Sequence, residues 1–91
     1  MLKLPALKTP VRVEWLDSVD SPGWQYAVSA KDIDFGLRPA MITRGVLVAV
    51  DEMSIAVATT IAPKGETDAK EGYLDVLTIP KGCILSVRVI P

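Results

Sequence analysis

The 91-residue sequence contains no histidine, a single cysteine (Cys83) and only 5% aromatic residues. Without histidine, the chain lacks the side chain that most often serves as a general base or metal ligand near neutral pH. One cysteine excludes an internal disulfide and any multi-cysteine metal site. Cys83 lies in an apolar stretch with no imidazole to activate its thiol, so we do not expect it to act as a nucleophile. These absences exclude the commonest catalytic and metal centres.

Long hydrophobic runs are also missing. The longest uninterrupted apolar run covers Val46 to Val50, whereas a membrane-spanning helix needs roughly 20 apolar residues. Residues Met1 to Pro10 contain two prolines and no long apolar core, which does not fit a signal peptide. The sequence therefore predicts a cytoplasmic protein.

The overall charge favours no particular class of partner. Ten basic and eleven acidic residues give a net charge of −1, so no global field attracts nucleic acid or acidic lipid. Apolar residues, mainly Val, Ile, Leu and Ala, make up 49% of the chain, although so small a domain buries a limited share of its surface. Large exposed apolar patches are uncommon on soluble monomers. We therefore expect a neighbouring subunit to cover part of this surface in a homo-oligomer.

Alternation of apolar and polar residues predicts five β-strands. Val11, Val13 and Trp15 share one face of the first strand, and Arg12 and Glu14 share the other. The five expected strands cover residues 11–16, 41–50, 54–62, 73–79 and 83–90.

The segments between the expected strands differ in character. We interpret residues 1–10 as an N-terminal arm that packs across the domain edge or onto a neighbour. Residues 24–38 are ambiguous, because Trp24 begins a helical spacing that later Asp, Gly and Pro residues interrupt, so a short helix and an edge strand are both open. Residues 63–72 are polar and predict a mobile hairpin loop, and Pro80 to Gly82 predict a turn.

Five short strands in one small domain, residues 11–91, favour an all-β, strongly bent barrel of the SH3-like or Sm-like kind. Closure into a barrel removes sheet edges that would otherwise invite aggregation. Gly45, inside the long second strand, predicts a bulge or a sharp bend that would turn the sheet through a corner.

The central stretch resembles the first signature of Sm-like proteins, the superfamily of Sm, Lsm and bacterial Hfq proteins. The matching positions are Gly45, Leu47, Asp51, Met53 and Ser54, followed by the alternating pair Ile55 and Val57. Ile79-Pro80-Lys81-Gly82-Cys83-Ile84 is similar to the second signature of the superfamily. The resemblance covers about half of the chain, from Arg44 to Ile90. The layout also resembles that of short proteins encoded by bacteriophages, which would place the chain in the host cytoplasm.

The resemblance implies a ring of five to seven copies whose strands pair edge to edge. It also implies that single-stranded RNA rich in uracil or adenine binds around the pore, in the two polar breaks of the chain. By position, Met53 would stack on a base, Ser54 would contact a base edge and Asp51 would orient the loop. Lys81 and Gly82 would approach phosphate and base. Stacking, edge contacts and cations are the means by which proteins bind single-stranded RNA.

Each of these residues also has a simpler interpretation. Asp51 and Ser54 are typical of tight turns, in which their side chains bond nearby backbone, and Lys81 lies in a Pro-Lys-Gly turn. Met53 would fill the core or an interface. Trp15 and Trp24 could stack on bases, but burial in the core or an interface is favoured for both.

No pattern points to catalysis or to a cofactor. The acidic residues at 17, 20, 32 and 34 fit no metal-binding loop, so a metal site is not expected. No two carboxylates have a spacing that indicates acid–base chemistry. The sequence thus leaves two non-enzymatic hypotheses: an RNA-binding ring, or a phage structural or adaptor ring that contacts other proteins. Lys81 and Arg44 facing the pore would favour RNA, whereas Asp51 and Glu52 dominating it would favour a protein partner.

Overall fold

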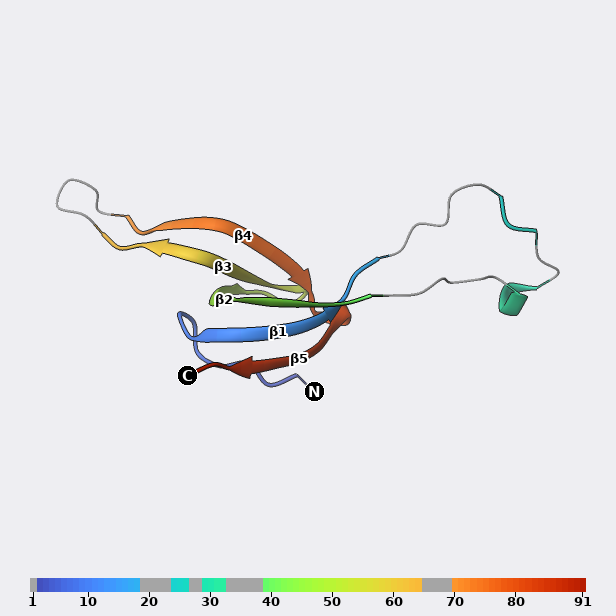
Figure 1. The fold of residues 1–91 in the computed structure, drawn as a ribbon, viewed down its shortest axis with the longest axis horizontal. Coiled ribbons are helices and arrows are strands. Elements are labelled where there is room, and N and C mark those ends of the chain that lie inside the picture. The colour runs from blue at the N-terminus through green and yellow to red at the C-terminus, as the bar shows by residue number, and fades with distance from the viewer. Residues whose placement is uncertain (1, 19–23, 27–28, 33–38, 65–69) are drawn as a thin grey trace.

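The computed structural model describes residues 2–18, 24–26, 29–32, 39–64 and 70–91. Five antiparallel strands form one sheet with the order β4-β3-β2-β1-β5 (Figure 1), which confirms the predicted small all-β fold. The strands are β1 (Pro10–Leu16), β2 (Ala40–Val50), β3 (Ser54–Ala62), β4 (Gly72–Pro80) and β5 (Ile84–Val89). Two 3-10 helices, η1 (Ala30–Asp32) and η2 (Lys81–Cys83), complete the described elements. In this order β4 and β5 are the two edges of the sheet.

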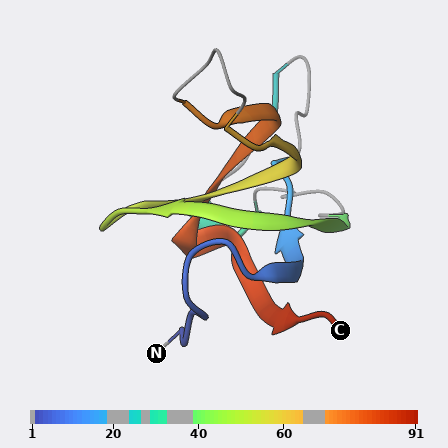
Figure 2. The ribbon, with the colours of Figure 1, turned by 90° about the vertical axis from the view of Figure 1, so that its left-hand side faces the viewer.

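The sheet bends strongly about its central strand. Viewed from the end, β3 and β4 lie on one side of β2, while β1 and β5 lie on the other (Figure 2). The bend brings apolar side chains from four strands into one small core. Its fully buried members are Val11, Val13, Leu47, Ile55, Val57 and Ile79.

At Gly45 strand β3 approaches β2 too closely to leave room for a Cβ atom. Gly45 pairs with Val11 of β1, and a Cβ atom at Gly45 would lie 2.5 Å from the carbonyl oxygen of Ala58 and 2.7 Å from Cγ1 of Val57. Only glycine leaves room for β3 to approach β2 this closely. The sequence predicted a bend or bulge at Gly45 itself, whereas the register irregularity on β2 lies between Leu47 and Ala49.

The N-terminal arm closes one side of the core. Leu4 packs against the buried cluster. The Lys8 backbone N–H donates to the Leu47 carbonyl at 2.6 Å, and the Leu47 N–H donates to the Thr9 carbonyl at 3.1 Å. Lys8 and Thr9 of the arm therefore both face Leu47 of β2, which is the arrangement of a β-bulge. The backbone of Lys8 adopts a left-handed φ of 68° at this bulge.

The β3–β4 hairpin has two unequal parts. Its proximal half, residues 54–58 and 76–80, includes the pair Ile55 and Ile79, both of which are buried. Its distal half, residues 59–62 and 72–75, projects beyond the other strands on the left of Figure 1. Asp75 in the distal half has a left-handed φ of 53°. Asp tolerates this conformation better than most residues, but it interrupts the regular pleat of the edge strand.

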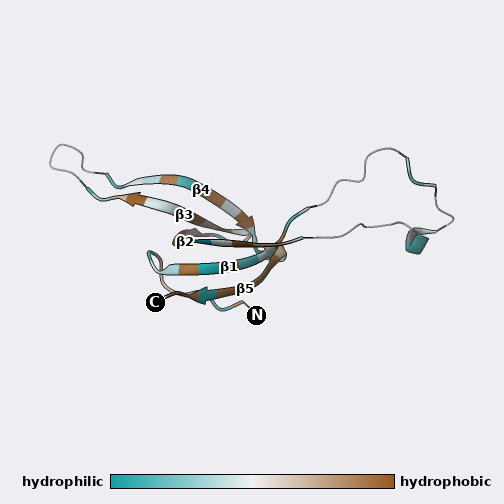
Figure 3. Cartoon of the chain, viewed as in Figure 1, coloured by the Kyte–Doolittle hydropathy of each residue, from teal (hydrophilic) through white to brown (hydrophobic). Residues whose placement is uncertain are grey.

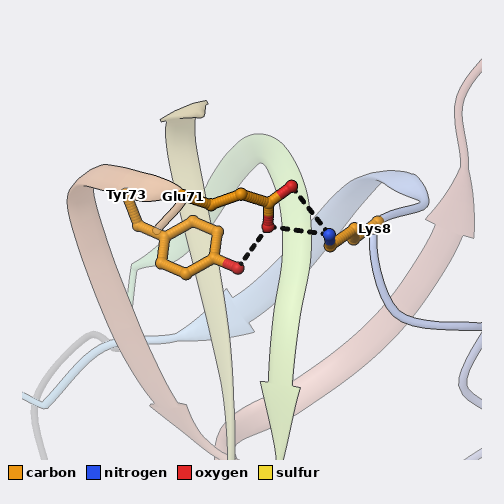
Figure 4. Close-up of polar contacts among 3 residues, drawn as sticks. All are labelled: Lys8, Glu71 and Tyr73. Carbon is orange, nitrogen blue, oxygen red and sulfur yellow. Dashed lines mark hydrogen bonds and ion pairs between the residues drawn. The ribbon is translucent and has the colours of Figure 1, made fainter. Parts of the chain in front are cut away.

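Three side chains connect the outer end of the distal half, where β4 begins, to the arm (Figure 4). The Lys8 ammonium lies 2.7 Å from Oε2 of Glu71 and donates a hydrogen bond to Oε1 at 2.8 Å. The Tyr73 hydroxyl donates to Oε2 of the same carboxylate at 2.8 Å. The hydrogen bond to Lys8 lowers the pKa of Glu71, and the carboxylate raises the pKa values of Lys8 and Tyr73. We call these three residues the clasp.

Two expectations for the connecting segments need correction. Residues 80–82 do not form a plain turn, because η2 continues to Cys83 and the Ile84 N–H bonds to the Lys81 carbonyl, so β5 begins one residue later than predicted. Trp24 is 88% exposed, so it is not buried in the core, and its alternative burial in an interface stays a prediction. Residues 24–26 lie on the same side of Figure 1 as η1, at the right and away from the sheet.

Parts of other predictions fall on residues that the structure does not describe. The proposed helix or edge strand over 24–38 includes residues 27–28 and 33–38, and the proposed mobile loop over 63–72 includes residues 65–69. Within the described residues no helix is both long and apolar enough to cross a membrane.

Candidate ligand-binding site

The two polar breaks singled out in the sequence meet at one end of the sheet. The Lys81 backbone N–H, at the start of η2, donates to the Met53 carbonyl in the β2–β3 turn at 2.8 Å. Ser54 and Pro80 face each other as the first pair of β3 with β4. All five predicted site residues, Asp51, Met53, Ser54, Lys81 and Gly82, therefore belong to one local surface.

Asp51 organises the β2–β3 turn. Its Oδ1 accepts hydrogen bonds from the backbone N–H groups of Met53, at 2.8 Å, and Ser54, at 2.7 Å. Its own N–H donates to the Ser54 carbonyl at 3.0 Å. The bonds from Met53 and Ser54, aided by the positive charge of Lys81, lower the pKa of Asp51 below its ordinary value of 3.8. Asp51 thus has the turn role that its residue type predicted, and it leaves the Met53 side chain free.

Met53 and the glycine beside Lys81 are open to solvent. The Met53 side chain is 75% exposed, so it does not fill the core, and its alternative placement in an interface stays a prediction. A Cβ atom placed on exposed Gly82 would meet nothing within 4 Å, so packing within the chain does not require glycine there. The surface offers an apolar side chain beside an open stretch of backbone, with Lys81 half-buried between them.

The charge of this surface is acidic rather than basic. Lys81 is accompanied by the carboxylates of Asp51 and Glu52, both on exposed residues. Arg44, the second cation expected at the pore, lies seven residues before Asp51 on β2, roughly 20 Å away along a regular strand. There it pairs with Arg12 of β1. At this surface of a single chain two carboxylates thus accompany one ammonium group, and which charges would face a pore stays a prediction.

The remaining polar candidates have structural partners. Oδ2 of Asp32 accepts from the N–H and the hydroxyl of Ser29, at 3.0 and 3.3 Å, and Oδ1 of Asp17 accepts from the Ser18 N–H at 2.8 Å. Residues 20 and 34 lie outside the described part of the chain. Among the described residues no three acidic, cysteine or histidine side chains are grouped to hold a metal ion.

Trp15 serves the core rather than a ligand. It packs against the buried cluster, and its Nε1 donates to the Thr43 hydroxyl at 3.0 Å. The favoured prediction for this residue is therefore confirmed. Two features of the surface were missed from the sequence: the clasp, which joins residues 63 positions apart, and the alignment of three arginines described below. Both depend on strand register, which a single sequence does not display.

Comparisons of the chain with protein-family models, with curated proteins and with solved structures found no match. Functional inference therefore rests on the residues and their geometry.

Proposed function

We propose that the chain assembles into a non-catalytic homo-oligomeric ring of the Sm-like type, with five to seven copies. The observation that carries this proposal is the exposure of apolar side chains along both edge strands of the sheet. On β4, Leu74 is 59% and Val76 is 47% exposed, and on β5, Leu85 is 53% and Val89 is 60% exposed. Apolar side chains thus accompany both rows of backbone groups that lack a partner strand within the described sheet (Figure 3).

Pairing β4 of one copy with β5 of the next would satisfy both edges at once. Exposed edge strands recruit other strands through their free N–H and C=O groups, and apolar side chains strengthen that tendency. A head-to-tail contact of two different edges closes into a ring when its rotation allows. The closed, barrel-like form of each subunit belongs to the same proposal.

In such a ring the β2–β3 turn and η2 would lie together around the pore. Single-stranded RNA is the ligand that the resemblance implies there, with Met53 against a base, Ser54 at a base edge, and Lys81 and Gly82 near phosphate and base. The open backbone at Gly82 and the exposed Met53 side chain support this assignment.

A second candidate function is a phage structural or adaptor ring that binds proteins. One observation favours it: Asp51 and Glu52 outnumber Lys81 at the candidate site, which disfavours phosphate.

Size-exclusion chromatography with light scattering tests the assembly. We expect a discrete ring for the wild type and smaller species for Val76→Glu, because a charge on the β4 edge opposes strand addition. Leu7→Glu is the matched control, since Leu7 is similarly exposed, at 55%, but lies outside the strands. A monomeric wild type would contradict the ring.

Adding labelled mixed-sequence RNA at low salt separates the two candidate functions. The RNA-binding ring predicts a complex that dissociates as salt rises and that weakens in Met53→Ala and Lys81→Gln. Lys31→Gln is the control for lost charge, because Lys31 lies in η1, away from the site. A ring that ignores RNA would assign the function to protein contacts.

A further inference from the structure

Three arginines from different strands stand in one row across the sheet. In the antiparallel register, Arg12 of β1 lies directly opposite Arg44 of β2 on one side and Arg88 of β5 on the other. Directly opposed residues project from the same face, with Cβ atoms about 5 Å apart. Since Val11 and Val13 point into the core, the arginines occupy the opposite, outer face. We call this set the arginine row.

The arginine row is poorly neutralised. Arg12 approaches one carboxylate, with its Nη1 3.8 Å from Oε2 of Glu14. Arg44 and Arg88 are exposed and form no ion pair with any described residue. Like charges placed directly opposite each other destabilise a sheet. The row therefore costs stability, and among the described residues Glu14 is the carboxylate that forms an ion pair with it.

Apolar residues border the arginine row. Continuing the register toward one end, Pro10 lies opposite Val46, and its carbonyl accepts the Ile90 N–H at 3.0 Å, which places these three residues in the next row of the same face. In the row on the other side, Ile42 lies opposite Glu14 and is 50% exposed. Figure 1 shows β2, β1 and β5 side by side as a continuous surface. The face thus combines a line of guanidinium groups with Val46 and Ile90 on one side and Ile42 on the other, where Ile42 shares its row with the polar residues Glu14 and Ser86.

We propose that the arginine row docks an acidic, partly apolar segment of a partner protein. Guanidinium groups bind carboxylates with two parallel hydrogen bonds, and arginine is enriched in the cores of protein interfaces. The bordering Val46, Ile90 and Ile42 would contact apolar side chains of the same segment. This surface is separate from the β2–β3 turn. It includes Arg88 of the edge strand β5, but its side chains project from the outer face of the sheet and not along the edge, so peptide binding by the row does not require ring formation.

The chemistry of the face favours carboxylates over a nucleic acid. Binding of single-stranded nucleic acid combines cations with aromatic rings on which bases stack. The nearest tryptophan, Trp15, belongs to the core side and its ring nitrogen is engaged by Thr43. Glu14 lies within the face, and the chain carries a net charge of −1, so no long-range attraction draws phosphate to it.

Fluorescence anisotropy with three labelled probes tests the proposal: a short peptide of alternating Glu and Leu, the same peptide with Gln in place of Glu, and oligouridine RNA. We expect wild-type protein to bind the Glu-Leu peptide and to bind the Gln-Leu peptide more weakly. Arg44→Gln/Arg88→Gln should weaken binding of the Glu-Leu peptide on the order of tenfold, because two carboxylates lose their partners. Both arginines are exposed, so this variant is expected to fold.

Lys3→Gln/Lys31→Gln removes the same charge elsewhere and should leave peptide binding unchanged. Equal affinity of the Arg44→Gln/Arg88→Gln variant and wild type for the Glu-Leu peptide, or no binding by wild type, would overturn the proposal. So would oligouridine binding that depends on Arg44 and Arg88 without peptide binding, since that result would assign the row to phosphate. Ring formation, measured separately, should be the same in both double variants.

Discussion

The two halves of the β3–β4 hairpin share the same strands and the same antiparallel pairing, yet they are stabilised in different ways. In the proximal half, Ile55 and Ile79 face the core and are almost inaccessible to solvent. In the distal half, Leu74 and Tyr73 are exposed, and the main tie to the rest of the molecule is the clasp. Backbone pairing alone does not make a stable hairpin, because an isolated pair of strands is marginal in water. The stability of each half of the hairpin therefore depends on whether its side chains pack against the core.

The largest expected effect on stability comes from a substitution in the proximal half, and it can be compared with a substitution in the distal half. Ile55→Ala should lower the free energy of unfolding by about 2–5 kcal/mol, because it removes a fully buried side chain from a core of few residues. Leu74→Ala, in the distal half, should change it by about 0.5 kcal/mol or less in the monomer. Urea unfolding of both variants gives the comparison. Equal losses would mean that the distal half is as well covered as the proximal half.

Gly45 tests the backbone contact that brings β3 over β2. Gly45→Ala should destabilise the fold by about 1–3 kcal/mol, because the new methyl group would overlap the Ala58 carbonyl, a backbone atom that cannot rotate away. Gly82→Ala is the matched control, since its Cβ would meet no atom within 4 Å. Thermal unfolding of the two variants measures the difference. A Gly45→Ala protein with unchanged stability would show that the strands separate easily at this point.

Asp51 starts the proximal half, and its contribution should depend on pH. The folded-state pKa of Asp51 lies below its ordinary value of 3.8, so the carboxylate stabilises the fold above that value and loses its effect as pH falls through the folded-state pKa. We expect Asp51→Asn to be less stable than wild type at neutral pH and the gap to narrow in acid. Unfolding midpoints measured across this range test the expectation. A gap independent of pH would contradict it.

The smallest expected effect concerns the clasp, because all three of its groups are accessible to solvent. Lys8→Gln should leave global stability almost unchanged and should speed hydrogen exchange of amides in the distal half. The effect should be present between the ordinary pKa of Glu71, 4.5, and that of Lys8, 10.5. It should fade as pH falls through the lowered pKa of Glu71 or rises through the raised pKa of Lys8. Lys3→Gln provides the control, and distal exchange that is equally fast in both variants would exclude the clasp as the tether.

The strands could be predicted from the sequence because alternation is a local property. The expected strand over residues 54–62 has the observed bounds, and the other strands differ by one or two residues. The meeting of Asp51, Met53 and Ser54 with Lys81 was also implied, since the signatures place these residues at the ends of neighbouring strands. Whether they bind RNA stays a prediction.

The features that were missed arise from contacts between distant parts of the chain. The need for glycine at position 45 comes from the position of Ala58, and the arginine row comes from the joint register of β2, β1 and β5. Burial in the core or an interface was favoured for Trp24, but its side chain is 88% exposed and does not reach the core. Residue type alone does not predict which distant segments of the chain lie next to each other in the sheet.

The left-handed residue Asp75 has a consequence for how far a strand from another copy could extend along β4. Strand addition proceeds only where the receiving backbone keeps its extended pleat, and a φ of 53° breaks that pleat in the middle of the edge. An added strand would therefore find a uniform template only over residues 76–80. A short template limits growth into long stacked fibrils, which need flat and uninterrupted edges. Asp75 thus divides the β4 edge into a segment, residues 76–80, that can receive a strand and a segment, residues 72–74, that lies beyond the change in backbone direction.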